Sequence, residues 1–400
     1  MITTTQADEI IRRNHPSMPA APCPLAEAHG RILREDIAAD RDIPPYDRVM
    51  MDGIAIRFEA WQQGRTSFPV EKIQPAGQAP VSLDNPDACI QIMTGAVLPT
   101  NCDCVIPIEQ VELSGTIAAL KAGVKPEKSQ FIHRRASDHP KGALLLKSGT
   151  LLQSPHIAVA ASVGRSSLLT GTRPSIAILS NGDELVDVGK EVESHQIRPS
   201  NAYGIQAALK SHGFDNMGVY QTPDNRQSIV HSLREALRGF DVLVLSGGVS
   251  MGKFDFVPLA LGEMGVAPLF HKVNQKPGKP LWFGQSVNSK IVFALPGNPV
   301  SCLVCLYRYV LPALWVAMGQ TDPQREWITL SQPVHVEKAM TCFVPCCEIK
   351  KQDGSREAEP RPFQNSGDYT ALAGTDGFVE LPEGALDFPA GAAVQIYRWS

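Results

Sequence analysis

Three short apolar runs in the middle of the chain each end in a turn that is rich in glycine or acidic residues, and a helical pattern follows each turn. The runs cover residues 175–179, 242–245 and 291–295. Continuous Val, Ile and Leu stretches bounded by turn residues are typical of strands buried on both faces, and such strands form parallel sheets covered by helices. Ligands bind beyond the carboxyl ends of the strands in open α/β sheets. We therefore expect the three turns to line one anion pocket.

The pattern between these runs completes an α/β domain. Residues 201–212 and 226–238 have the apolar period of amphipathic helices, and residues 217–220 between them predict a strand. Parallel strands require such crossover helices, so these elements belong to one sheet.

The flanking segments carry other patterns. Helical periodicity in residues 5–39 is interrupted by prolines and predicts two short helices, and residues 151–163 predict a helix with Ser154 as N-cap and Pro155 at its first position. Short apolar runs separated by turn residues are typical of β modules. They occur at residues 53–56, 68–73, 89–93, 104–108, 117–120 and 130–133, and again at 328–330, 334–336, 342–349, 377–381 and 393–398.

Composition and charge narrow the classes of function. A chain of 400 residues with 43% hydrophobic and 20% charged residues is typical of a globular protein of two to four domains. The net charge of -4 gives no bulk attraction for nucleic acid or anionic membranes, so anion binding must be local. The most apolar segment, residues 300–318, contains Arg308 and Pro312 and predicts a buried helix rather than a membrane span. No secretory signal is visible in residues 1–11, and a cytoplasmic protein is expected.

The nine cysteines raise the question of a metal site. A structural zinc site needs two paired knuckles, whereas the closest cysteine pairs here lie in segments of different character. Cys302 and Cys305 fall in an apolar helical run, where free cysteine behaves as a small hydrophobe. We expect core cysteines, and an odd count argues against a disulfide framework.

The glycine-rich turns supply the first candidate chemistry. Glycines after residues 242–245 allow the backbone to approach a ligand and to direct N–H groups toward it. In the turn after residues 291–295, Pro299 can open the next helix and so place a helix N-terminus at the pocket. Taken alone, such turns fit either a binding loop or ordinary turn chemistry. The candidate residues are Ser246, Gly247, Gly248, Ser250, Gly252, Pro296, Gly297, Asn298 and Pro299.

Three lysines, Lys272, Lys276 and Lys279, follow one another closely. An exposed basic loop would account for them, but neighbouring prolines and a glycine make the segment rigid, and it leads into a strand of the same sheet. Fixed cations beside glycine turns suit phosphoryl and other oxyanion groups, so we expect these lysines to bind anions.

Carboxylates occur in the same turns. Asp183 and Glu184 follow the first apolar run, Asp224 precedes a predicted helix, and Asp255 follows the glycine loop. Each fits a solvated surface acid, but together beside the lysines they suit a hard cation such as Mg²⁺ that bridges phosphate oxygens. Asp52, in an Asp-Gly pair, is a further acid in a tight turn, although Asp-Gly also favours an ordinary hairpin.

The sequence motifs that contain these turns, lysines and carboxylates resemble the motifs of a known family. The matching motifs occur in the family's order along nearly the whole chain, at residues 51–55, 92–96, 181–185, 246–252 with Asp255, 276–280, 295–299 and 365–367. The chain is similar to the molybdopterin molybdenumtransferases, the MoeA family that includes the C-terminal E domain of gephyrin.

This resemblance implies a homodimer of four-part subunits with an elongated helical and β N-terminal part. The molybdopterin-binding domain would have three α/β/α layers, and the C-terminal domain would be barrel-like. The parts would be a discontinuous helical segment at residues 1–45 and 140–170, an inserted β domain at 46–139, the α/β domain at 171–321 and the C-terminal β domain at 322–400.

The resemblance also implies insertion of molybdate into adenylylated molybdopterin with release of AMP, assisted by Mg²⁺. A molybdopterin adenylyltransferase is an expected partner. Asp52 and Thr94 would come from across the dimer interface. Glu184, Asp224 and Asp255 would handle the metal and hydrolysis of the adenylate; Lys272, Lys276 and Lys279 would hold molybdate or phosphate oxygens; Pro296, Pro299 and Ser366 would shape the pocket.

Some residues of this chain differ from the family motifs, and these differences leave alternative functions open. They lie at the expected pocket rim and dimer contacts, at Arg48, Ala136, Ser137, Arg198, Pro199 and Pro345. Preference for molybdate or tungstate and the recipient enzyme stay open. A non-catalytic carrier of the pterin is a second hypothesis, which the retained acids and lysines oppose. An adenylyltransferase is a third, which the additional β modules oppose.

Overall fold

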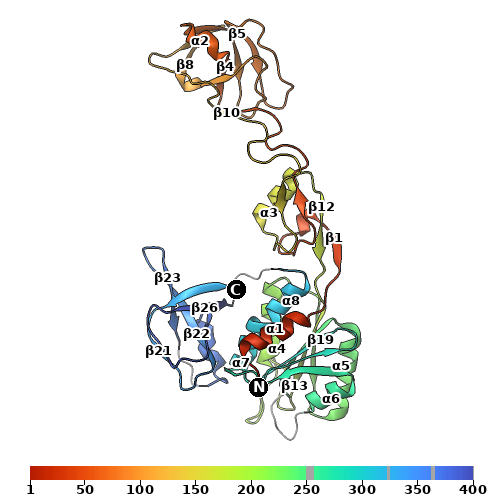
Figure 1. The fold of residues 1–400 in the computed structure, drawn as a ribbon. Helices are drawn as coiled ribbons and strands as arrows, with labels where there is room; N and C mark the ends of the chain where they lie inside the picture. The colour runs from red at the N-terminus through yellow and green to blue at the C-terminus, as the bar shows by residue number, and fades with distance from the viewer. Residues whose placement is uncertain (249–255, 322–324, 362–364, 400) are drawn as a thin grey trace. The chain divides into compact units, whose positions relative to one another are not determined.

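The computed structural model describes residues 1–248, 256–321, 325–361 and 365–399, and the chain divides into two compact units (Figure 1). Unit 1 comprises Met1–Glu35, Ser148–Ser154 and Ser167–Ser400, and unit 2 comprises Asp36–Lys147 and Pro155–Ser166. Each unit has apolar clusters of its own.

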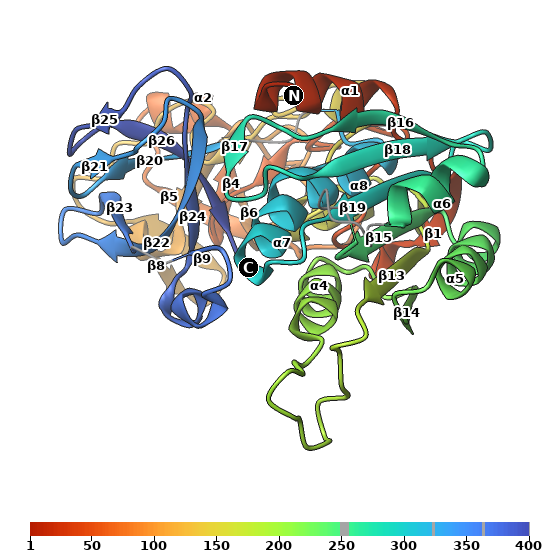
Figure 2. The same cartoon turned by 90° about the horizontal axis from the view of Figure 1, so that it is seen from below.

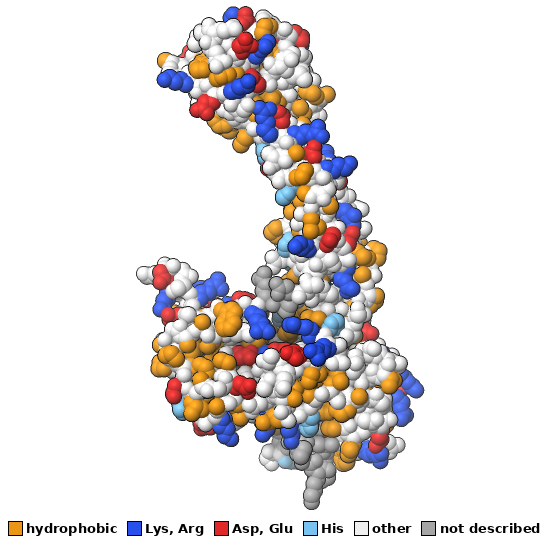
Figure 3. All heavy atoms as spheres, viewed as in Figure 1, with side chains coloured by type: hydrophobic (Ala, Val, Ile, Leu, Met, Phe, Trp, Pro, Cys, Tyr) orange, Lys and Arg blue, Asp and Glu red, His pale blue; other side chains and the backbone are white. Residues whose placement is uncertain are grey.

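Unit 2 is built mainly from short strands, which confirms the β pattern in this segment. Its main sheet has the strand order β7-β4-β6-β5-β9-β8. Alternate residues of β4 enter two separate cores, Ile54 in one and Ala55 in the other, so the sheet is covered on both faces. Basic and acidic side chains are interspersed on the face of unit 2 that Figure 3 presents. Its elements are β2 (Ile37–Ala38), β3 (Arg48–Val49), β4 (Gly53–Ile56), α2 (Phe58–Gln62), β5 (Ser67–Gln74), β6 (Cys89–Ile92), β7 (Cys104–Pro107), β8 (Val111–Ser114), β9 (Ile117–Leu120), β10 (Ile132–His133), β11 (Leu144–Leu146) and most of α3 (Ser154–Ser162).

In unit 1 the three apolar runs form adjacent parallel strands, as predicted (Figure 2). The sheet has the order β14-β13-β15-β19-β18-β16. It is mixed rather than wholly parallel, because β18 and β19 are joined by a short turn and so must be antiparallel. Its elements are β13 (Ile176–Asn181), α4 (Ser200–Ser211), β14 (Met217–Thr222), α5 (Arg226–Gly239), β15 (Val242–Ser246), α6 (Val257–Glu263), β16 (Val266–His271), β18 (Trp282–Ser286) and β19 (Ile291–Leu295).

Helices cover both faces of this sheet and make three layers. Ile178 and Val244 pack with α4 on one face, whereas Leu179 and Leu245 pack with α5 and α6 on the other. The predicted buried helix is confirmed in the core of the first face, as α7 (Pro299–Cys305), a π-helical turn (Leu306–Val310) and α8 (Leu311–Ala317). This 19-residue stretch meets the length and hydropathy of a membrane span, but 78% of its apolar window is buried inside the protein.

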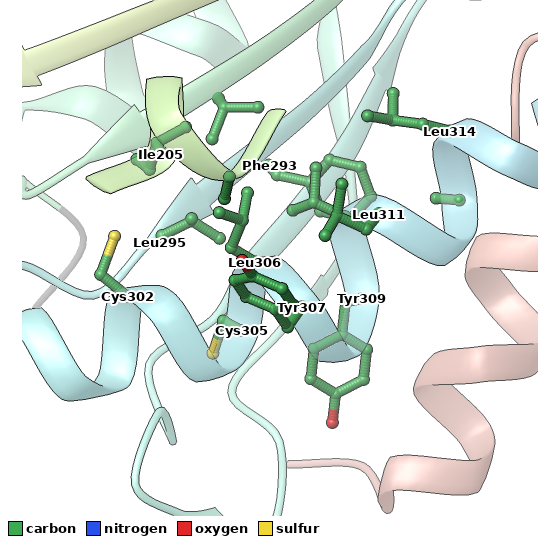
Figure 4. Close-up of a cluster of buried hydrophobic side chains, with 14 of the residues drawn as sticks. Ile205, Phe293, Leu295, Cys302, Cys305, Leu306, Tyr307, Tyr309, Leu311 and Leu314 are labelled. Atoms are coloured by element: carbon green, nitrogen blue, oxygen red, sulfur yellow. The ribbon is translucent and has the colours of Figure 1, made fainter. Parts of the chain in front are cut away.

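Cys302 and Cys305 are fully buried on the core helix, with their sulfur atoms pointing in opposite directions (Figure 4), and their burial confirms the prediction of core cysteines. Burial raises the pKa of the Cys302 thiol to about 12. Both thiols therefore act as small apolar groups at neutral pH.

The last part of unit 1 is a barrel-like sheet. The ring closes because β22 pairs with both β23 and β24, and β17 (Gln275–Lys276) joins it from the α/β segment. The other elements are β20 (Glu326–Leu330), β21 (Val334–His335), β22 (Thr341–Lys350), β23 (Arg356–Pro360), β24 (Gly377–Leu381), β25 (Asp387–Phe388) and β26 (Ala393–Arg398).

One helix prediction was wrong in part. After α1 (Thr4–Arg13), the second predicted helix is replaced by β1 (Ala20–Pro24), which pairs with β12 (Ser167–Gly171), and by a 3-10 turn, Leu25–Glu27. The prolines of β1 prevent a helix but are tolerated in a peripheral two-stranded ladder. The helix expected at residues 151–163 is present as α3, which begins at Ser154, next to the predicted first position at Pro155. The Leu152 N–H donates to the Arg31 carbonyl at 2.9 Å instead of joining the helix.

Candidate active site

The carboxyl ends of β13, β15 and β19 meet at one edge of the sheet and form the centre of the candidate site. The Gly247 N–H donates to the Leu295 carbonyl at 3.2 Å, which ties two of the turns together. The Asn201 side-chain amide, from the first turn of α4, donates to Ser246 Oγ at 2.7 Å and to the Gly297 carbonyl at 2.8 Å. Hydrogen bonds therefore join two of the three turns predicted to share a pocket, those after β15 and β19.

The glycine turn after β15 requires glycine for steric reasons. Gly247 and Gly248 have φ angles of 92° and 72°, in the left-handed region that favours glycine. A Cβ atom on Gly248 would lie 2.7 Å from a methyl carbon of Val257. The backbone of the turn thus lies closer to its surroundings than any side chain would permit. Ser250, Gly252 and Asp255, also predicted for this site, lie outside the described residues.

Three buried polar atoms at this edge have no hydrogen-bond partner among the described residues. They are Ser180 Oγ, Asn181 Nδ2 and Asn201 Oδ1. Ser180 is 3% exposed and Asn181 is 9% exposed. Leaving such a group unpaired costs about 1–3 kcal/mol, so these atoms are donors and acceptors that a ligand can satisfy.

Two of the three lysines lie at the same edge of the sheet. Strand β16 runs parallel to β19, and its last residue, His271, lies in the row of Ala294. Lys272 follows immediately, and the Val273 N–H donates to the Lys279 carbonyl at 3.0 Å, which brings the backbone of Lys279 beside this turn.

Lys276 has a different position. It belongs to β17, which pairs with β22 of the barrel-like sheet, and its Nζ lies 3.5 Å from Glu337 Oε2. The lysine segment therefore connects the edge of the α/β sheet to the C-terminal sheet.

The predicted acids after β13 and β14 are neighbours. The Asp224 N–H donates to Asp183 Oδ1 at 3.0 Å. The carboxylate of Glu184 lies against the turn, since a Cβ atom on Gly182 would lie 2.6 Å from Glu184 Oε2. No group of three His, Cys, Asp or Glu side chains with metal-binding geometry occurs within the described part of the chain.

The Pro-Gly-Asn-Pro turn contacts the segment that contains Ser366. The Asn298 side-chain amide donates to Ser366 Oγ at 2.6 Å, and the Val300 N–H donates to the Ser366 carbonyl at 3.1 Å. Helix α7 begins at Pro299, as the sequence predicts. Pro296 and Gly297 lie between this contact and β19, so Ser366 lies beside the turn with which it is predicted to shape the pocket.

Asp52 and Thr94 form a closely bonded pair in unit 2. Asp52 Oδ1 accepts hydrogen bonds from the Thr94 N–H at 2.6 Å and from the Thr94 hydroxyl at 2.7 Å. The backbone hydrogen bond, followed by that of the hydroxyl, lowers the pKa of Asp52 below its ordinary value. Gly53 is required next to it, since a Cβ atom there would lie 2.0 Å from the Ile106 carbonyl oxygen.

Three residues of the site, Ser180, Asn181 and Asn201, were not among the predicted site residues. The sequence did contain a signal for two of them, because Ser180 and Asn181 are polar residues that directly continue a buried apolar strand. Asn201 could not be found in this way, because its role depends on where α4 begins relative to the sheet.

Replacing Thr94 by valine is expected to raise the pKa of Asp52 toward its ordinary value. The hydroxyl hydrogen bond is lost, but the backbone bond remains, so the pKa rises only in part. A carboxyl whose pKa is lowered by folding stabilises the protein above its unfolded-state pKa and loses that contribution as the pH falls. An NMR titration of the Asp52 carboxyl carbon measures the change, with Thr100→Val as the control; an identical titration curve for Thr94→Val would contradict the expectation.

Comparisons with known proteins identify the family of the chain. Sequence models match the MoeA N-terminal region (domain I and II) at residues 2–164, a probable molybdopterin binding domain at residues 177–315 and the MoeA C-terminal region (domain IV) at residues 328–399. The chain is 38% identical to a molybdopterin molybdenumtransferase of Synechocystis over 100% of both chains, and 32% identical to one of Staphylococcus aureus over 99% of this chain and 95% of the other. A crystal structure of the molybdopterin biosynthesis MoeA protein from Pyrococcus horikoshii matches over 100% of both chains with a TM-score of 0.82 and 25% identity. The chain therefore belongs to the molybdopterin molybdenumtransferase (MoeA) family.

Proposed function

We propose that this protein inserts molybdenum from molybdate into adenylylated molybdopterin, with release of AMP. The observation that carries the proposal is the joining of the turns after β15 and β19 by Asn201, at 2.7 and 2.8 Å, beside buried polar atoms at the end of β13 with no partner in the described chain. Such a cradle suits a ligand that carries both oxyanions and hydrogen-bonding groups. Membership of the family supports this substrate.

The lysines at the carboxyl ends of the strands suit the negative charge that develops during the reaction. Cleavage of the bond between AMP and the pterin phosphate builds negative charge on phosphate oxygens, and fixed cations stabilise that charge. Lys272 and Lys279 supply cations at this edge, and Lys276 extends the positive charge toward the barrel-like sheet. Their ammonium groups would also hold the oxygens of molybdate.

The acids at the ends of β13 and β14 would hold a magnesium ion together with Asp255. The Asp224 N–H donates to Asp183 and the Glu184 carboxylate lies against the same turn, but no three of these carboxylates converge within the described residues. Carboxylate oxygens are the ligands that Mg²⁺ takes from proteins. Glu184, Asp224 and Asp255 would hold the ion, which when bound supplies further positive charge to phosphate oxygens.

Further features of the proposal concern assembly and location. We place the protein in the cytoplasm as a homodimer that receives its substrate from a molybdopterin adenylyltransferase. In this assembly Asp52 and Thr94 of one subunit would complete the site of the other. The four-part division of the chain proposed from the sequence assigns these two residues to the inserted β domain.

The decisive experiment measures AMP release from adenylylated molybdopterin by the purified protein, with and without molybdate and Mg²⁺. Release that requires both supports the proposal. Tight binding without release would instead favour a carrier, and formation of adenylylated molybdopterin from ATP would favour an adenylyltransferase. Replacement of molybdate by tungstate in the same assay measures the preference between the two anions.

A further inference from the structure

A cavity of about 270 Å³ lies between helix α4 and the edge strand β14, next to the joined turns. Ala202, Tyr203 and Gln206 line it from α4, and these positions share one face of the helix. Val219 and Gln221 line it from β14, and Ser180 lines it from the adjacent strand β13. The cavity thus lies on the α4 face of the sheet, where Val219 and Gln221 of the outer strand are exposed.

The sheet face becomes polar where the cavity meets the site. Along β13, Ile176 and Ile178 pack in the α4 core, and the next residue on that face is Ser180. Its strand neighbours in register are Gln221 on β14 and Ser246 on β15. A polar row therefore leads from the cavity directly to the Ser246 turn.

The hydroxyl of Ser180 points to a ligand in this cavity. It is buried at 3% exposure, lines the cavity, and has no hydrogen-bond partner among the described residues. Its neighbour in the row, Ser246 Oγ, already accepts from Asn201. Because an unpaired buried hydroxyl destabilises the protein, its presence at a cavity wall is explained best by a group that pairs with it in the bound state.

The volume of the cavity and the residues that line it indicate which kind of ligand group pairs with Ser180. Small-molecule pockets usually have volumes of about 300–1,000 Å³, so this cavity accommodates a ring system rather than a whole nucleotide. Tyr203 is 53% exposed and Val219 is 45% exposed, and both offer uncovered apolar surface for the face of a flat ring. The Ser180 hydroxyl and the Gln206 amide can each donate and accept, as the edge of a nitrogen heterocycle requires.

We propose that this cavity binds the planar nitrogen heterocycle of the substrate, while the charged groups of the substrate lie at the joined turns. The inference rests on the proposed function for its substrate, which carries two such rings, the pterin and the adenine. The cavity lining suits the planar shape and the hydrogen-bonding nitrogen atoms that both rings share. Separate probes therefore decide whether the pterin or the adenine binds.

The test measures binding of 6-hydroxymethylpterin and of AMP separately, by equilibrium dialysis with the purified full-length protein. Val219→Trp fills the cavity from a strand position that tolerates aromatic residues, and it is expected to weaken one of the two probes at least tenfold. The affected probe identifies the ring. Val287→Trp, at an 86% exposed turn position, is the matched control and should bind both probes like the wild type.

Ser180→Ala gives a second, independent prediction, in which stability and ligand binding change in opposite directions. Removing an unpaired buried hydroxyl should raise the stability of the unliganded protein, whereas binding of the same probe should weaken about five- to tenfold. Unchanged binding of both probes in Ser180→Ala and Val219→Trp, or no binding of either probe by the wild type, would overturn the inference.

The failure of this inference is distinguishable from failure of the proposed function. AMP release by the wild type that depends on molybdate, together with unchanged probe binding in both variants, would overturn the cavity assignment alone. Absence of AMP release, together with probe binding that both variants weaken, would overturn the proposed reaction and leave the ring site in place.

Discussion

Replacing Lys272 by glycine is expected to stabilise the protein slightly while removing most of its activity. Lys272 has a φ of 73°, in the left-handed region that costs a residue with a side chain about 1–2 kcal/mol. Glycine adopts this region without that cost, although it gains freedom in the unfolded chain, so the expected net stabilisation is at most about 1 kcal/mol. Strained residues of this kind cluster at functional sites, because the strain fixes where the side chain begins.

The activity of the Lys272→Gly variant should fall because a cation is lost beside the joined turns. Removal of one fixed donor from the charge that develops during reaction typically lowers kcat by about 10²–10³-fold. Lys272→Ala should lose as much activity but keep the strained backbone, so its stability should stay close to that of the wild type. Molybdate-dependent AMP release and urea denaturation of the three proteins measure the two effects.

A matched control separates the backbone from the side chain. Ser289 also has a positive φ, 61°, but it lies in the turn between β18 and β19, which is at the other end of the strands from Lys272. Ser289→Gly should gain stability as Lys272→Gly does and should keep its activity. Wild-type activity in both lysine variants would show that Lys272 serves only to close the turn before Val273.

The central α/β fold followed from the sequence because its signals are local. Residues 176–179, 242–245 and 291–295 are continuous apolar runs, and only strands covered on both faces bury such runs completely. The antiparallel position of β18 did not follow, since it depends on the short turn from Ser286 to Ile291 rather than on the apolar content of the strand. The short β1 was missed because its prolines and alanines lack any strand pattern, and only pairing with β12 makes it extended.

Site residues could be predicted from the sequence where the local backbone of a turn requires a particular residue type. Glycines with positive φ and a proline at the start of α7 are required by the local backbone, so Gly247, Gly248 and Pro299 could be identified in advance. Asn201 could not, because its amide reaches Ser246 and Gly297 across 45 and 96 positions of the sequence. Contacts of this kind are set by the packing of α4 on the sheet and leave no local pattern.

The largest stability effect is expected at Arg308, in the core helical stretch. Its guanidinium donates two hydrogen bonds to Asp8 of α1, at 2.6 and 2.8 Å, and one to Glu380 of β24 at 2.8 Å. The Tyr397 hydroxyl of β26 donates to the same oxygen of Glu380 at 2.8 Å. Burial alone would lower the pKa of Arg308, but the hydrogen bonds from Arg308 to Asp8 and the nearby acids hold that pKa well above its ordinary value. One buried cation thus connects the N-terminal helix, the core of the α/β part and the barrel-like sheet.

Arg308→Met should lower the free energy of unfolding of unit 1 by about 3–5 kcal/mol, because it leaves Asp8 and Glu380 without their buried cation. Urea denaturation followed by tryptophan fluorescence measures the loss. Arg13→Met is the matched control, since Arg13 lies 3.9 Å from Glu9 with its side chain 79% exposed, and such pairs contribute little. Adding Asp8→Asn and Glu380→Gln to Arg308→Met removes the unpaired charges and should recover much of the loss, because replacing a whole buried ion pair is often nearly neutral. If Arg308→Met lost less than about 1 kcal/mol, the buried charges would have to be hydrated in the variant, and other contacts, such as the pairing of β17 with β22, would hold the parts of unit 1 together.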